Sequence, residues 1–227
     1  MSRLNYRYVF LVTYARSGST LLQSLINSAP NVQIRGENNN TLFHLFRSHE
    51  AVLDTAERGR FGQQASPDEP WFGAGAVKPV WYLNSMVDRF VNTVLSPDDG
   101  VKVTGFKEIR YIPYYMKDGE FDLYMDFLVK NFPDARIIFN SRNAEAVSRS
   151  GWHVQEDPVK LIETVRQSDE RFAAYTVKSD HARHMIYDQY VADHSLIRQM
   201  FDFLDLPFDA DRVEAVFAKP LTHAKKG

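Results

Sequence analysis

The sequence predicts an α/β fold of three layers, in which helices flank both faces of a mostly parallel central sheet. Two observations support this prediction. Short apolar runs bounded by turn residues alternate along the chain with segments whose apolar residues recur at helical spacing. Each strand is therefore joined to the next through a helix, and a connection of this kind leads to a parallel neighbour.

Five apolar runs are expected to form the strands. They lie near residues 7–14, 32–36, 101–107, 135–141 and 184–188. The first and fourth runs are the most continuous. A strand that is apolar on both faces is typical of the buried middle of a parallel sheet, so we expect these two strands in its interior.

Seven segments have the spacing of helices. They cover residues 19–28, 81–95, 120–131, 143–150, 158–178, 191–204 and 210–218. In open α/β sheets, ligands bind at the carboxyl ends of the strands. We therefore look for functional residues in the loops that follow the strands.

The segment 58–79 is rich in glycine and proline and has no clear period. A long segment of this kind in a compact domain is usually functional or mobile, which favours a surface loop or lid, and a plain disordered insertion is an equal alternative. The sequence shows no internal repeat. We expect a single domain over residues 1–227.

Composition limits the class of protein. The formal net charge is -2, which argues against nucleic acid or an anionic membrane as the main partner. The absence of cysteine excludes disulfides and thiolate metal sites and suits the cytosol. Residues 6–13 do not resemble a signal peptide, and no apolar run approaches the roughly 20 residues that span a bilayer. We expect a cytoplasmic protein without membrane insertion, and the sequence indicates no oligomeric state.

The loop Ala15-Arg16-Ser17-Gly18-Ser19-Thr20 lies between the first strand and the first helix. A strand-loop-helix arrangement presents main-chain N–H groups to a phosphate. Gly18 lets the backbone approach closely, Ser19 and Thr20 add hydroxyl donors, and Arg16 adds a permanent charge. The loop predicts an anion site, with a simple helix cap beside a solvated arginine as the alternative.

The same loop departs from the pattern of magnesium-dependent nucleotide kinases. Its first glycine is missing, and Ser19 stands where a lysine would follow Gly18. The third and fourth strands end in Lys107 and Ser141 rather than in an aspartate that would bind magnesium. A divergent P-loop kinase or phosphoryl transferase is kept only as an alternative.

This loop resembles the one that cradles the 5′-phosphosulfate in sulfotransferases that use 3′-phosphoadenosine-5′-phosphosulfate (PAPS), above all in the bacterial, carbohydrate and tyrosylprotein branches. The resemblance implies a P-loop-NTPase-like fold and transfer of a sulfuryl group to an acceptor hydroxyl on a small molecule or carbohydrate. It implies that Arg16, Ser17, Gly18, Ser19 and Thr20 bind the donor. A catalytically silent protein that binds PAPS is a further alternative.

The fourth strand delivers Arg142 at its end, and Ser150 follows eight residues later. This resembles the family's 3′-phosphate motif, although the family often has Asn-Pro after the arginine and this chain has Asn143-Ala144. The match implies that the product is adenosine 3′,5′-bisphosphate. Taken alone, Arg142 would be a surface ion-pair partner and Ser150 a hydroxyl at a helix end. Trp152 could stack on the adenine or lie buried in the core.

In-line sulfuryl transfer needs a base for the proton of the acceptor. Glu37 follows the second strand and resembles the general base of the bacterial and tyrosylprotein branches. Its alternatives are a carboxylate paired with Arg35 or one that caps the next helix. Glu108 and His153 are the other candidate bases.

Transfer also needs fixed positive charge. Lys107 ends the third strand, where several sulfotransferases have a lysine that contacts the transferring group, and we give this role to Lys107 and Arg16. A solvated Lys107 balanced by Glu108 is the alternative. A sulfuryl group carries one negative charge fewer than a phosphoryl group, so no metal is expected. The acceptor stays open, because the aromatics at 111–115 and 81–82 could line a pocket or fill a core.

Overall fold

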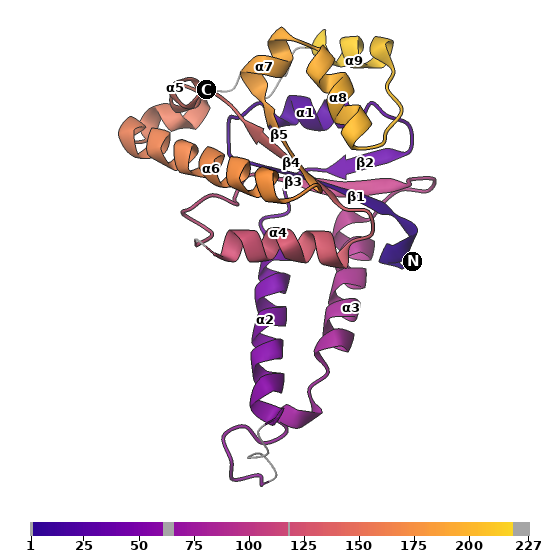
Figure 1. Ribbon diagram of the computed structural model, residues 1–227, viewed down its shortest axis with the longest axis vertical. Coiled ribbons are helices and arrows are strands. Elements are labelled where there is room, and N and C mark those ends of the chain that lie inside the picture. Colours follow the sequence, from indigo (N-terminus) through magenta and orange to yellow (C-terminus); the bar gives the residue numbers. More distant parts are fainter. Residues whose placement is uncertain (1, 61–65, 118, 220–227) are drawn as a thin grey trace. The chain divides into compact units, whose positions relative to one another are not determined.

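The computed structural model describes residues 2–60, 66–117 and 119–219. Its centre is a five-stranded sheet in which every pair of neighbours is parallel, in the order β2-β3-β1-β4-β5 (Figure 1). The strands are β1 (Arg7–Thr13), β2 (Val32–Arg35), β3 (Val103–Glu108), β4 (Arg136–Ser141) and β5 (Ala182–Ile186). The predicted α/β class is confirmed, and β1 and β4 are interior strands as expected.

Helices cover both faces of this sheet. One face carries α1 (Ser19–Ile26), α7 (Tyr187–Ala192), α8 (Ser195–Phe203) and α9 (Ala210–Phe217), and the other carries α4 (Glu120–Asn131) and α6 (Pro158–Lys178). The short helix α5 (Ala144–Ser148) and the 3₁₀ segment Gly151–Gln155 connect β4 to α6. The predicted helices therefore exist, with ends that differ by a few residues.

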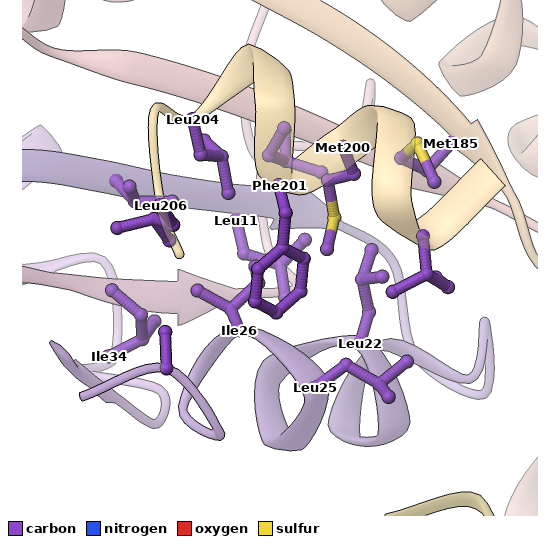
Figure 2. Close-up of a cluster of buried hydrophobic side chains, with 14 of the residues drawn as sticks. Leu11, Leu22, Leu25, Ile26, Ile34, Met185, Met200, Phe201, Leu204 and Leu206 are labelled. Atoms are coloured by element: carbon purple, nitrogen blue, oxygen red, sulfur yellow. The ribbon is translucent and has the colours of Figure 1, made fainter. Parts of the chain in front are cut away.

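The side chains of β1 enter two hydrophobic layers, one on each face of the sheet. Alternate side chains of a strand point to opposite faces of the sheet. Leu11 packs with Leu22 and Ile26 of α1 and with Phe201 of α8, as Figure 2 shows. The rings on the opposite face include Phe10, Phe132, Phe139 and Phe172, and the centroids of Phe139 and Phe172 are 4.8 Å apart. Both layers anchor the strands whose carboxyl ends form the site.

Residues 40–96, with Ser2 and Arg3, form a compact unit separate from the rest of the chain. It contains α2 (Thr41–Arg60) and α3 (Pro79–Phe90), the latter extended by a π-helical turn at Val91–Leu95. The sequence did not predict α2. Its buried positions, Leu42, Phe43, Phe46 and His49, are confined to its first half, so the second half has no apolar stripe to reveal the helix.

The segment 58–79 is less irregular than predicted. Residues 58–60 belong to α2, Ala74–Ala76 form a 3₁₀ turn and α3 begins at Pro79. Residues 61–65 lie outside the described part of the chain. A lid in this segment, and the single-domain organisation, stay predictions.

Candidate active site

The sheet register brings five loops to one edge. Arg35 pairs with Phe106, Val12 with Glu108, Thr13 with Asn140 and Ser141 with Ile186. The residues that follow these strands therefore share the carboxyl edge of the sheet, where open α/β proteins bind their ligands.

The loop after β1 starts α1 in a way that only glycine allows. Gly18 has a φ of 81° and is the N-cap residue of α1. A Cβ at this position would lie 2.1 Å from the ring of Tyr187, so a side chain is excluded by both strain and contact. In the described chain no side chain caps this end of α1. The Leu21 N–H donates to the Gly18 carbonyl at 3.0 Å, and the uncapped end of the helix is where an anion could bind.

Buried hydrogen bonds fix the loop from beneath. The Thr13 hydroxyl lies 2.6 Å from the Ser17 hydroxyl and donates to the carbonyl of Asn140 at 2.7 Å. The Asn140 amide donates to the carbonyl of Ser17 at 2.9 Å and accepts from the Tyr190 hydroxyl at 3.1 Å. These buried groups attach the loop to the ends of β1 and β4.

Arg16 joins the loop to the segment after α5. Its Nε donates to the hydroxyl of Ser150 at 3.1 Å, and its guanidinium lies 5.7 Å from the centre of the Trp152 ring. The structure therefore brings these three predicted site residues together. Trp152 is 57% exposed, so the alternative of a tryptophan buried in the core is wrong. Its ring is available to a ligand.

Arg142 reaches the same loop from the end of β4. Its Nη1 donates to the carbonyl of Arg16 at 3.2 Å, and its guanidinium lies 4.7 Å from the centre of the Tyr187 ring. Within the described chain no carboxylate forms an ion pair with it, and its buried Nε has no hydrogen-bond partner. The alternative of a surface ion-pair partner is therefore wrong. A half-buried cation whose buried Nε has no partner fits an anionic ligand.

Tyr14 holds the main chain of Arg142. The N–H of Arg142 donates to the Tyr14 hydroxyl at 2.8 Å, and this hydroxyl lies 3.1 Å from the Arg142 carbonyl, to which it can donate. Burial, with a smaller contribution from Asp169, raises the pKa of the Tyr14 phenol far above its usual range. The hydroxyl thus keeps its proton. Ser141 extends the network by donating to Asp169 and by contacting His184 Nε2 at 2.6 Å.

Tyr14→Phe is expected to weaken binding of adenosine 3′,5′-bisphosphate about 3- to 10-fold, because the N–H of Arg142 loses its partner and the guanidinium its fixed position. Calorimetric titration measures this. Tyr175→Phe is the matched control. The Tyr175 hydroxyl donates to Asp126 at 2.8 Å on the same face of the sheet and does not contact Arg142. Equal affinities for Tyr14→Phe and wild type would contradict the positioning role.

Glu37 and Lys107 form an ion pair at the ends of β2 and β3. The Lys107 ammonium lies 2.5 Å from Glu37 Oε1, and Arg110 Nη1 lies 3.7 Å from Glu37 Oε2. Arg35, the partner considered for Glu37, pairs with Asp98. Lys107 is only 6% exposed, so the solvated lysine balanced by Glu108 is wrong. A carboxylate and a cation thus meet beside the loop.

The two other candidate bases are more deeply buried than Glu37. Glu108 is fully buried, accepts from the N–H groups of Asn38 and Ile109, and pairs with Arg110 at 3.2 Å. His153 is buried, and its Nδ1 lies 3.4 Å from the carbonyl of Val147. Glu37 is the most accessible of the three, since a third of its side chain is exposed.

Sequence reasoning missed Tyr14, Asn140 and Tyr187 as parts of this site. Asn140 had a signal, because a polar residue inside the apolar run 135–141 needs a buried partner. Tyr14 and Tyr187 follow strands directly, which places them at the ligand-binding edge. In the described ranges no cluster of three or more histidine, aspartate or glutamate side chains could hold a metal. No helix within the same ranges has the length and apolar character to cross a membrane.

A parallel sheet in this strand order, with a glycine-containing loop between β1 and α1, defines a P-loop-like α/β fold. A model of the sulfotransferase family matches residues 9–210. The chain belongs to the sulfotransferase family.

Solved structures with a similar fold include two sulfotransferase domains. The sulfotransferase domain of the Synechococcus PCC 7002 olefin synthase is 18% identical, with a TM-score of 0.57 over 96% of this chain and 80% of that one. The sulfotransferase domain from the curacin biosynthetic pathway is 15% identical, with a TM-score of 0.54 over 95% and 79% of the two chains. No curated protein sequence matches this chain.

Proposed function

We propose that this sulfotransferase takes its sulfuryl group from PAPS and transfers it by in-line displacement to an acceptor hydroxyl, with Glu37 as the general base. The observation that carries the proposal is the contact of 2.5 Å between Glu37 and Lys107 at the edge that also bears the loop of Gly18. Base, cation and anion-binding loop stand together, as the reaction requires.

The donor would be held at two points. The main-chain N–H groups of the loop and the side chains of Arg16, Ser19 and Thr20 would bind the 5′-phosphosulfate. Ser17 would contribute its N–H, because its hydroxyl already contacts Thr13. The 3′-phosphate would meet Arg142, whose buried Nε has no partner within the described chain, and Ser150. Trp152 would offer its exposed ring to the adenine or to the acceptor.

The residues of the chain have separate tasks in the transfer. PAPS supplies the sulfuryl group, whose bond to the 5′-phosphate oxygen breaks as the bond to the acceptor oxygen forms, and adenosine 3′,5′-bisphosphate leaves. Glu37 accepts the proton of the acceptor hydroxyl. Lys107 has three N–H donors, so it can keep one bond to Glu37 and turn another to the charge that develops. Arg16 adds a second fixed cation, and we propose no metal.

Nucleotide selectivity tests this proposal. In calorimetric titrations without magnesium, we expect adenosine 3′,5′-bisphosphate to bind in the micromolar range and adenosine 5′-phosphate to bind about tenfold or more weakly. This order follows from a dedicated contact to the 3′-phosphate. Tighter binding of magnesium-ATP than of the bisphosphate would overturn the proposal in favour of a phosphoryl transferase.

A further inference from the structure

A cavity of about 570 Å³ adjoins the proposed reaction centre. It lies between the segment after β3, the 3₁₀ segment Gly151–Gln155 and the first turns of α6. We propose that this cavity is the acceptor pocket and that it takes an aryl alcohol, a flat and mostly apolar ring that carries a hydroxyl group. This inference rests on the proposed function and adds the substrate class.

The position of the cavity suits an acceptor. Tyr14 and Ala15, just before Arg16, line it from the side of the loop. Arg110 lines it from the side of β3, and the same guanidinium lies 3.7 Å from Glu37 Oε2. This end of the cavity therefore reaches the guanidinium that also contacts the proposed base, and the first residue of the proposed anion-binding loop. The volume is within the usual range for pockets that bind small molecules.

Aromatic and aliphatic side chains form the walls. Tyr114, Tyr115 and Trp152 all line the cavity and are well exposed, and the rings of Tyr114 and Tyr115 meet edge to face at 4.8 Å. The floor contains Leu161 and Val165 of α6. Exposed rings around an apolar floor provide stacking and edge contacts for a flat ligand.

The polar residues of the lining favour a ring with few hydroxyl groups. Asp157 caps α6 by accepting from Val159 at 3.0 Å, while the hydroxyls of Thr164 and Ser168 donate to main-chain carbonyls one turn earlier. A carbohydrate would need a partner for each hydroxyl that it buries, and the hydroxyls of Thr164 and Ser168 already donate to the main chain. The exposed Glu156 and Lys160 have opposite charges, so the mouth shows no preference for a charged ligand.

Fluorescence of Trp152 tests binding without any need for turnover. The chain has three tryptophans, so a protein with Trp71→Phe and Trp81→Phe reports on Trp152 alone. We expect 2-naphthol to quench this signal with saturation and glucose to leave it unchanged. Saturable quenching by glucose, or none by 2-naphthol, would overturn the assigned ligand class.

Turnover with PAPS links the cavity to the reaction. We expect kcat/KM for 2-naphthol to exceed that for glucose at least tenfold. Leu161→Trp fills the cavity and should raise KM for 2-naphthol tenfold or more with bisphosphate affinity unchanged, whereas Val177→Trp, on the exposed face of α6, should change neither. An unchanged KM in Leu161→Trp contradicts this inference alone. Absence of bisphosphate binding in wild type contradicts the proposed function, while quenching of Trp152 would still support the ligand class.

Discussion

Glu37→Gln is expected to lower sulfuryl transfer about 10²- to 10⁴-fold, the usual contribution of a general base. The amide keeps the size of the carboxylate but cannot accept the acceptor proton. The affinity for adenosine 3′,5′-bisphosphate should not fall, because the neutral amide no longer offsets the charge of Lys107, which contacts Glu37 at 2.5 Å. Initial rates with PAPS, together with calorimetric titration of the bisphosphate, separate the two effects.

Two further variants show whether the loss of activity is specific to Glu37. Glu108→Gln should mainly lower thermal stability, because the buried carboxylate bonds two main-chain N–H groups and Arg110. Glu163→Gln changes an exposed carboxylate on α6 and should have no effect on turnover. If Glu37→Gln keeps more than a tenth of the wild-type rate, another group is the base.

Arg142→Ala is expected to raise the dissociation constant of adenosine 3′,5′-bisphosphate about 10- to 100-fold, because a hydrogen bond between charged groups contributes roughly 1.5–3 kcal/mol. Binding of adenosine 5′-phosphate should change far less, since it lacks the 3′-phosphate. The ratio of the two affinities is therefore the diagnostic quantity. A loss that is equal for both nucleotides would show that Arg142 supports the loop without contacting the 3′-phosphate.

Arg136 offers a matched control at the opposite end of β4. Its guanidinium contacts His181 and the ring of Phe203, far along the strand from the loop. Arg136→Ala should leave the affinities for both nucleotides unchanged. Arg142→Lys should recover only part of the lost affinity, because lysine keeps the charge but not the planar fork of donors.

The sheet could be predicted from the sequence because each strand is marked by residues that are adjacent in the chain. Each buried strand is a short apolar run, and the order of strands and helices leaves few allowed topologies. The loop of Gly18 could be predicted for the same reason, since one short segment contains the turn, the donors and the charge. Helix α2 was not predicted because only its first half is buried. An amphipathic pattern indicates which residues of a helix are buried, so an exposed helix does not show it.

The contacts within the site could not be predicted to the same extent. The pairing of Glu37 with Lys107 joins residues 70 positions apart, and sequence reasoning offered Arg35 and Glu108 as their partners instead. Several charged residues lie at the same edge of the sheet, and only the register of the strands determines which of them form pairs. Tyr14 was missed because its hydroxyl acts on a main chain 128 positions away, a role that leaves no local pattern. The exposure of Trp152 likewise depends on how the 3₁₀ segment packs.

The central claim is tested most directly by turnover without magnesium. Wild type and Glu37→Gln would each be incubated with PAPS and an acceptor panel of 2-naphthol, glucose and a tyrosine peptide, with adenosine 3′,5′-bisphosphate and sulfated product both quantified. We predict equimolar formation of the two products by wild type and their near absence with Glu37→Gln. No sulfated product from any acceptor, or magnesium-dependent turnover of ATP in its place, would contradict it.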